Sequence, residues 1–389
     1  MSPVLGQEQV SNMYTSFSIK NFRCIKEMTI ESLARVNLIA GMNNMGKTAL
    51  LEALWLHSGP NIPDLGDRLA RFRGIPGQDP GRLMHDLFYG FDPNGMITLS
   101  AKEVGEVDKN TLKIKLQKRD DVVATAVSSP DSPSIPPRGS QESDVSAVSD
   151  TAIVLEYTDN KGRKYVSSGW WVRSEGPALQ LGANARMAFT NEGVAGQSAQ
   201  MPDRPTSIFI SARQRSGPEE DVSRFGKVEL EGYADRLTGC IKQADDRIKR
   251  LLTIAALPTP MIYADVGLSR PIPIGFLGDG VGRLLSMALA FHDARGGMIF
   301  IDEVENGLHY SVLENVWSEL NWLSNEFDVQ VFATTHSKEC MIAARDAFSS
   351  MNDTSLFIHR LDLQDGRIAA TTYTFEDLDF ALDYEAEMR

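Results

Sequence analysis

The stretch Gly41-Met-Asn-Asn-Met-Gly46-Lys47-Thr48 decides the fold of this 389-residue chain, because it has the spacing of a phosphate-binding loop. An apolar run at residues 36–40 precedes it and a helical pattern from Ala49 follows it, which is the strand–loop–helix order that such a loop requires. The glycines let backbone N–H groups close around phosphate oxygens, and the helix N-terminus adds a favourable dipole. We therefore expect a bound nucleoside triphosphate, with Lys47 at its β- and γ-phosphates and the Thr48 hydroxyl at Mg²⁺.

A pair of acids marks a second motif far along the chain. The apolar run 298–301 predicts a buried parallel strand, and Asp302 and Glu303 follow it directly. The first acid of such a pair can hold the hydration shell of Mg²⁺, and the second can polarise the attacking water. The alternative is that both are solvated charges at a strand end. The phosphate loop in the same chain favours the functional interpretation.

Two further segments extend the pattern. Gly278, Asp279 and Gly280 form a turn before a helical stretch, between the phosphate loop and the acidic pair. Alone, such a turn predicts only a loop. His336 follows another apolar run, where a γ-phosphate sensor is expected, although a lone histidine at a strand end is more often structural.

In this order the residues resemble a known family. They are similar to the ABC-type ATPase heads of the SMC, RecF and OLD groups, and most similar to the compact AAA15-type ATPases allied to OLD. Residues 17–23 resemble the first strand of those heads, residues 41–54 their Walker A loop and helix, and residues 277–281 their signature segment. Asp302 and Glu303 match the Walker B pair, the D-loop follows at 305–309, and residues 335–337 match the histidine switch.

The resemblance implies an ATPase that uses ATP and Mg²⁺. It implies Glu303 as the residue that orients or deprotonates the attacking water, His336 as the γ-phosphate sensor, and Lys47 as the catalytic cation. Thr48 and Asp302 are implied as metal ligands. The implied nucleotide-binding residues are Gly41, Asn43, Asn44, Gly46, Lys47, Thr48, Ala49, Gly278, Asp279 and Gly280.

The same analogy implies a homo-oligomer, at least a dimer, through heads that sandwich ATP. The signature turn of one subunit would then close over the ATP of another. The chain departs from the family at Gly278, where a serine is common, so this position cannot supply the serine hydroxyl contact to the γ-phosphate. The Q-loop glutamine is not placed, with Gln78 as the candidate.

The fold class that these motifs and the resemblance imply is α/β. We expect a P-loop NTPase, an ABC-ATPase head with a mixed sheet, an antiparallel β subdomain and a helical subdomain. Residues 14–100 are assigned to a first ATPase segment, 101–200 to an antiparallel β insertion, and 201–389 to a second ATPase segment. Within the insertion, 128–150 is rich in Ser, Pro and Asp and is expected to be disordered. Apolar spacing over 233–256 predicts an amphipathic helix of about six turns, and Thr374 with Asp377 predicts the cap of a terminal helix.

Composition agrees with a cytoplasmic protein. Hydrophobic residues make up 42% and charged residues 23% of the chain, which is ordinary for a globular protein. Charges interrupt the long apolar stretches, so we expect no membrane span, and the polar N-terminus does not have the pattern of a secretory signal. Cys24, Cys240 and Cys340 are widely spaced, which suits a reduced compartment and no metal site.

Charge leaves DNA binding open. The net charge of −13 shows no bulk basic character of the kind that strong DNA binding needs. A basic strand face at 109–119 is a local exception, and such runs are usually just solvated. Arg213 and Arg215 follow a predicted strand and could meet a phosphate or a partner subunit, or simply lie at the surface.

We therefore expect a regulatory ATPase of an anti-phage defence system. It would control a separate nuclease or toxin effector, plausibly Toprim-like, because only a short segment follows His336 and no Toprim domain is expected within it. The alternative is a DNA-maintenance ATPase of the RecF or SMC kind that clamps DNA as an ATP-dependent dimer. A third hypothesis is an ATP-bound scaffold with negligible turnover.

Overall fold

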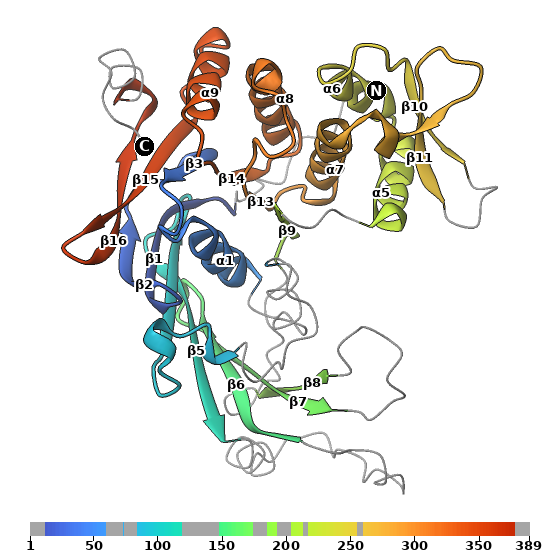
Figure 1. Ribbon diagram of the computed structural model, residues 1–389. Coiled ribbons are helices and arrows are strands. Elements are labelled where there is room, and N and C mark those ends of the chain that lie inside the picture. The colour runs from blue at the N-terminus through green and yellow to red at the C-terminus, as the bar shows by residue number, and fades with distance from the viewer. Residues whose placement is uncertain are drawn as a thin grey trace, which may run out of the picture.

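The computed structural model describes residues 12–59, 73, 84–118, 148–173, 185–192, 204–212, 217–254 and 260–377, with only the backbone described at 148–150, 169–173, 185–192 and 218. Two large sheets, a central mostly parallel one and an antiparallel one, lie on either side of helix α1 (Lys47–Ser58). Further helices cover the face of the central sheet that points away from α1 (Figure 1).

The central sheet has six strands in the order β16-β15-β3-β14-β13-β9. All neighbouring pairs are parallel except the hairpin of β15 with β16. The strands are β3 (Val36–Gly41), β9 (Ser207–Ile210), β13 (Met298–Ile301), β14 (Gln330–Thr334), β15 (Leu356–Gln364) and β16 (Arg367–Tyr373). Because β3, β13 and β14 are parallel neighbours, their carboxyl ends meet at one edge of the sheet, where ligands of open α/β sheets bind.

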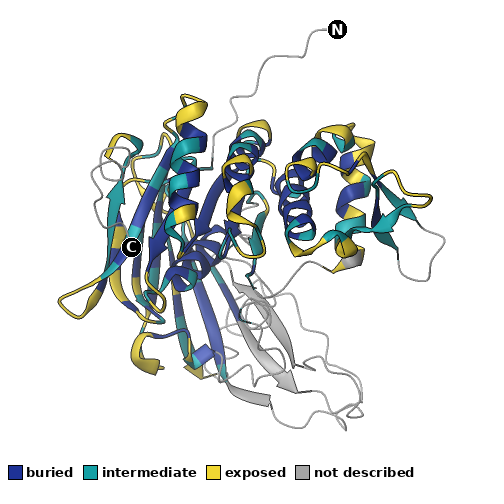
Figure 2. Cartoon of the chain, turned by 45° about the horizontal axis from the view of Figure 1, so that its top comes forward, coloured by how far each residue is buried: buried dark blue, intermediate teal, exposed yellow. Residues whose placement is uncertain are grey.

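Alternation along these strands feeds two cores. Leu38, Ile299 and Val331 belong to the core on the helical face, whereas Ile39 and Phe300 point to the opposite face. Strands β3, β13 and β14 are buried along their whole length, which matches the apolar runs in the sequence. The buried residues of Figure 2 accordingly fill both sides of the central sheet.

The second sheet is antiparallel and has seven strands in the order β2-β1-β4-β5-β6-β7-β8. Its strands are β1 (Tyr14–Phe22), β2 (Ile25–Ile30), β4 (Ile97–Glu103), β5 (Lys109–Lys118), β6 (Val148–Thr158), β7 (Lys164–Arg173) and β8 (Ala185–Glu192). Helix α1 packs between this sheet and the central one, with its leucines in the core that both share. The helix that follows the phosphate loop is therefore held from both sides.

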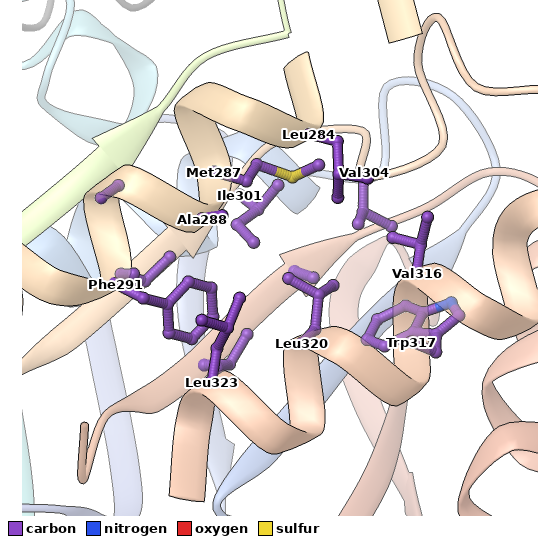
Figure 3. Packing of buried hydrophobic residues seen from close by; sticks show 14 of the residues in the cluster. Leu284, Met287, Ala288, Phe291, Ile301, Val304, Val316, Trp317, Leu320 and Leu323 are labelled. Carbon is purple, nitrogen blue, oxygen red and sulfur yellow. The ribbon is translucent and has the colours of Figure 1, made fainter. Parts of the chain in front are cut away.

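Helices cover the other face of the central sheet. They are α7 (Asp279–Asp293), α8 (Leu313–Glu326) and α9 (Lys338–Ser350). Figure 3 shows side chains of α7 and α8 in one buried cluster, with Phe291 of α7 beside Leu323 of α8 and Leu284 of α7 beside Val304. This packing fixes the helix that follows the signature turn against the strand that ends in the acidic pair.

A helical subdomain lies beside α7. It contains α5 (Pro218–Leu230), α6 (Ala234–Lys242) and a three-stranded sheet of β10 (Arg250–Ile254), β11 (Met261–Asp265) and β12 (Ile272–Pro273). Short 3-10 turns complete the described elements: η1 (Tyr89–Phe91), η2 (Ile274–Leu277) and η3 (Tyr310–Val312). The α/β fold class, with a mixed sheet, an antiparallel β subdomain and a helical subdomain, is confirmed, while the three-segment division of the chain stays a prediction.

The predicted helix over 233–256 is wrong. The structure ends α6 at Lys242, turns at 243–249, and continues as strand β10, which pairs with β11. Leu237, Ile241, Ile248 and Leu251 are buried as the apolar spacing requires. The spacing of apolar residues does not reveal that the segment is divided into a helix and a strand, because both elements bury these residues. Strand β11, which pairs with β10, also lies outside residues 233–256.

Two smaller predictions meet the structure in part. Residues 148–150 lie in β6, not in a disordered loop, because they extend the edge that pairs with β7; residues 128–147 fall outside the described part. The basic stretch is strand β5, in which Leu112 and Ile114 are buried while Lys109 and Lys113 are exposed. At the other end of the chain, the Thr374 hydroxyl accepts from the Asp377 N–H at 3.4 Å and the Asp377 carboxylate accepts from the Thr374 N–H at 3.1 Å, which is the predicted cap.

Candidate nucleotide site

The phosphate loop uses a backbone that few residues other than glycine adopt. Gly41 has φ 145°, Asn44 has φ 66° and Gly46 has φ 79°. A Cβ on Gly41 would lie 2.7 Å from the Leu361 carbonyl oxygen of β15, so a side chain there would displace the neighbouring strand. Asn44 is among the residue types that tolerate positive φ. Asn43 and Asn44 are exposed, as expected for residues that line a phosphate site.

The loop leads into a helix N-terminus with backbone donors that the helix itself does not use. Leu50 N–H is bonded to the Gly46 carbonyl at 2.8 Å, so the helical ladder starts there. The preceding amides, those of Lys47, Thr48 and Ala49, belong to the first turn, whose N–H groups have no partner within the helix. Ala49 itself is buried, which leaves its backbone rather than its side chain for a ligand. A helix N-terminus of this kind binds anions.

Lys47 lies across the mouth of the loop. Its Nζ donates to the carbonyl oxygens of Gly41 at 2.7 Å and Met42 at 2.9 Å. Burial lowers the pKa of this ammonium, whereas the negative charges of Asp302, Glu303 and Glu305 act in the opposite direction. The structure therefore brings a cation and three acids around the phosphate loop.

A chain of hydroxyl groups joins the loop to the acidic strand end. Thr48 Oγ1 donates to both carboxylate oxygens of Asp302, each at 3.1 Å. Thr334, at the end of β14, donates to Asp302 Oδ1 at 2.8 Å and accepts from the Glu303 N–H at 2.8 Å. Burial raises the pKa of Asp302, and these two hydroxyl bonds oppose that shift. The sequence gives no sign of this role for Thr334. The residue lies between the two motifs only because β14 stands between β3 and β13 in the sheet.

Arg283 is a second residue that the sequence did not indicate. It lies on α7, is 7% exposed, and donates to the carbonyl oxygens of Asp302 at 2.7 Å and Glu303 at 2.8 Å. It also reaches the carbonyl of Ser211 at 3.3 Å. Glu303 has a positive φ of 49°, so it lies outside regular secondary structure. The Arg283 side chain holds its backbone carbonyl instead. The helix of the signature segment therefore supports the peptide that carries the acidic pair.

The signature turn packs against the D-loop. Gly278 has φ 107° and precedes α7, in which Asp279 is the first residue. A Cβ on Gly280 would lie 2.7 Å from the carbonyl oxygen of Gly307, so only glycine permits this approach. Gly278 and Asp279 are exposed. The structure thus places the turn on the side of the acidic strand end.

His336 lies beyond the end of β14, and its side chain is 48% exposed. Its Nδ1 is 3.3 Å from Glu305 Oε1, which also accepts from the His336 N–H at 3.1 Å. Gln78, Arg213 and Arg215 lie outside the described residues, so their assignments stay predictions.

The site fits Mg²⁺ held in the manner of a nucleotide cofactor. Among the described residues, no group of three or more His, Cys, Asp or Glu side chains has an arrangement that could hold a metal ion. Mg²⁺ at phosphate sites typically keeps waters and substrate oxygens, and it takes only one or two protein ligands. The Thr48 hydroxyl and the Asp302 carboxylate are adjacent hard oxygen donors of that kind. Within the described part of the chain, no helix combines the length and apolar character that a membrane crossing requires.

Comparison with known proteins agrees with this geometry. Residues 13–127 match the family model described as AAA ATPase domain, and residues 188–341 match the one described as AAA domain, putative AbiEii toxin, Type IV TA system. A protein of Helicobacter pylori named ATP/GTP phosphatase is 25% identical over 402 residues, covering 97% of this chain and 100% of that protein. The uncharacterized protein MJECL10 of Methanocaldococcus jannaschii is 50% identical over 82 residues, 20% of this chain and 36% of that protein.

Solved structures of SMC heads are also similar. An SMC head bound to the C-winged helix domain of ScpA is 13% identical with a TM-score of 0.48, covering 95% of this chain and 99% of that one. The SMC head domain from Thermotoga maritima is 12% identical with a TM-score of 0.40, covering 92% and 98%. The two family matches include the phosphate loop, the acidic strand end and His336, so the chain is an ATPase with two segments similar to the AAA domains that these family models describe.

Proposed function

We propose that this ATPase is the regulatory switch of an anti-phage defence system, and that its ATP cycle controls a separate nuclease or toxin effector of the Toprim-like kind. The observation that carries the ATP switch is the continuous bonded path from Thr48 through Asp302 and Thr334 to the Glu303 backbone. The defence role draws on the toxin–antitoxin description of the family that residues 188–341 match.

In this proposal each residue has one task. Lys47 would bind the β- and γ-phosphates, Thr48 and Asp302 would hold Mg²⁺, and Glu303 would orient the water that attacks the γ-phosphorus. The bond from the γ-phosphorus to the bridging oxygen then breaks, and ADP and inorganic phosphate leave. His336 contacts the γ-phosphate. Such catalysis is mostly positioning and charge stabilisation.

The switch itself would be an ATP-dependent assembly of two or more copies. The turn of Gly278, Asp279 and Gly280, in which the first two residues are exposed, would close over the ATP held by another copy, and hydrolysis would separate the copies. A state trapped before hydrolysis should therefore be the larger species. This links the local chemistry to a signal that an effector can read.

The first prediction concerns the two principal site residues. Lys47→Ala should lose ATP binding, because the loop then lacks its cation. Glu303→Gln should bind ATP, lose turnover by about a hundredfold or more, and accumulate the closed assembly. Phosphate release and size exclusion with light scattering, with and without ATP and Mg²⁺, measure both effects.

Glu314→Gln is the matched control, since Glu314 is an exposed acid on α8. Turnover by Glu303→Gln at the wild-type rate would refute the assignment of Glu303.

For the defence role, phage plating on a host that carries the gene with its neighbours should show fewer plaques, and Lys47→Ala should restore them. Equal plaque counts for the host with the wild-type gene and for a host without it would reject that role.

A DNA clamp is the second candidate, favoured by the exposed lysines of β5 such as Lys109 and Lys113. It predicts assembly of Glu303→Gln only when duplex DNA is present, with affinity that falls steeply as salt rises. Assembly with ATP alone favours the effector switch. The parallel run with DNA separates the two.

A further inference from the structure

Glu305 lies two residues after Glu303, the second acid of the pair. Its side chain is 12% exposed, and its Oε1 accepts from Thr335 Oγ1 at 2.8 Å and from the His336 N–H at 3.1 Å. The segment that ends β14 and the D-loop are thereby joined at one carboxylate oxygen.

The same oxygen lies beside the histidine ring. His336 Nδ1 is 3.3 Å from Glu305 Oε1, which is ion-pair distance. A hydrogen bond from an Nδ1 proton to this oxygen requires the ring to rotate, and hydrogen bonds of catalytic groups commonly tighten when substrate binds. The bond that one ring nitrogen makes sets the tautomer of the other. Nε2, on the other side of the ring, forms no hydrogen bond with the part of the chain that the structure describes, so it is available to a ligand.

The second carboxylate oxygen is not used by the fold. Glu305 Oε2 is buried and has no hydrogen-bond partner among the described residues. Leaving a buried carboxylate oxygen without a partner costs free energy, and a role in catalysis is one of the explanations for such a group. The charge of Glu305 also acts on Lys47, which places this carboxylate within electrostatic reach of the phosphate site.

A purely structural role for Glu305, as an anchor of the D-loop, does not explain why a charged carboxylate lies beside the His336 ring. Other bonds already hold the D-loop: the Val304 N–H donates to the Thr334 carbonyl at 3.0 Å, and Asn306 Nδ2 donates to the Ala212 carbonyl at 2.9 Å. A neutral acceptor would satisfy Thr335 and the His336 amide equally well. A buried carboxylate beside the ring adds what a neutral acceptor would not: a negative charge at Nδ1.

We propose that Glu305 is a positioning residue for His336, which holds the ring with its Nδ1 proton toward the carboxylate and leaves Nε2 for the γ-phosphate. This inference rests on the proposed role of His336 as γ-phosphate sensor. Glu305 touches neither the nucleotide nor the water in this scheme. It acts through the histidine alone.

The first test reads the tautomer without turnover. The full chain is labelled with ¹⁵N-histidine and studied at about pH 8, above the ordinary His pKa of about 6.5; His336→Gln assigns the ring signals. The wild type should show the Nδ1–H form, and Glu305→Gln should shift the population toward Nε2–H. Glu319→Gln, which also removes a buried carboxylate, is the control and should leave the His336 signals unchanged.

Either of two results overturns the proposal. One is a wild-type His336 that is mainly Nε2–H, which needs no variant to fold. The other is a Glu305→Gln spectrum that matches the wild type at His336. Because neither result depends on hydrolysis, a failure of the proposed function is recognised separately, as a wild-type chain that releases no phosphate.

The second test uses kinetics. Glu305→Gln should lower kcat by about tenfold to a hundredfold, by analogy with the carboxylates that orient metal-bound histidines, with the KM for ATP within about twofold. Glu319→Gln should keep kcat within about twofold. A Glu305→Gln variant that raises only KM, or that loses no more kcat than Glu319→Gln, contradicts a positioning role.

Discussion

Gly280 is the residue on which the approach of the signature turn to the D-loop depends. A methyl group there would lie 2.7 Å from the Gly307 carbonyl oxygen, whereas a methyl on Gly275 would meet nothing within 4 Å. Gly280→Ala should therefore lower the free energy of unfolding by about 1–3 kcal/mol through overpacking and slow ATP turnover. Gly275→Ala is the control for both readouts. Equal denaturant midpoints and turnover rates for the two variants would show that the D-loop yields to the methyl group.

Glu52 shows how a buried charge supports the phosphate-loop helix. It is fully buried in α1 and pairs with Arg23 at 2.5 Å and with Arg73 through two bonds at 2.8 and 2.9 Å. Glu52→Gln removes the negative charge that both guanidinium groups share, and we expect a loss of about 3–5 kcal/mol in unfolding free energy. Urea titration checks this against Glu314→Gln, an exposed acid that should cost less than about 0.5 kcal/mol.

At the scale of elements, glycine positions separate helix propensity from packing. Gly226 lies inside α5 with nothing within 4 Å of an added Cβ, while a Cβ on Gly297, just before β13, would be 2.2 Å from the Thr206 carbonyl oxygen. Gly226→Ala should stabilise the protein by about 0.5–1 kcal/mol. Gly297→Ala should destabilise it, because β13 cannot then pair with β9 in its present register. Thermal unfolding of both variants tests this, and stabilisation by Gly297→Ala would be incompatible with the register.

Elements also show where sequence reasoning succeeds. The phosphate loop, its flanking strand and its helix are contiguous, so their order alone predicts the geometry around Lys47 and Thr48. The same holds for Asp302, which directly follows a buried strand. By contrast, the predicted helix over 233–256 divides into α6 and β10, because strand pairing with β11 overrides the local helical spacing.

At the scale of the whole molecule, two buried histidines should set the stability in mild acid. Burial lowers the pKa of His57 and of His359 to about 3, from the ordinary histidine value of 6.5. Above pH 6.5 both are neutral whether the chain is folded or not. Below it, the unfolded chain takes up a proton at each that the folded chain does not, so stability falls as the pH drops from about 6.5 toward 3. At pH 5 the loss should be about 2 kcal/mol for each histidine.

Urea unfolding between pH 7 and pH 5 measures this slope. His359→Gln should remove about half of the slope, whatever its effect on stability at pH 7. His309→Gln, at an exposed histidine, should leave the slope unchanged. A wild-type slope near zero over this range would mean that the folded chain can protonate both histidines.

The sequence by itself determined the chemical groups of the site. Lys47, Thr48, Asp302 and Glu303 stand in two local motifs, and each motif carries its own strand, so no distant contact is needed to recognise them. Tertiary structure alone decided how the motifs meet. Strand order places β14 between β3 and β13, and this inserts Thr334 between loop and acid. The packing of α7 brings Arg283 to the Glu303 carbonyl, and the end of β14 brings His336 to Glu305. These residues are far apart in the chain, and only strand neighbours and helix packing, which depend on the whole core, bring them together.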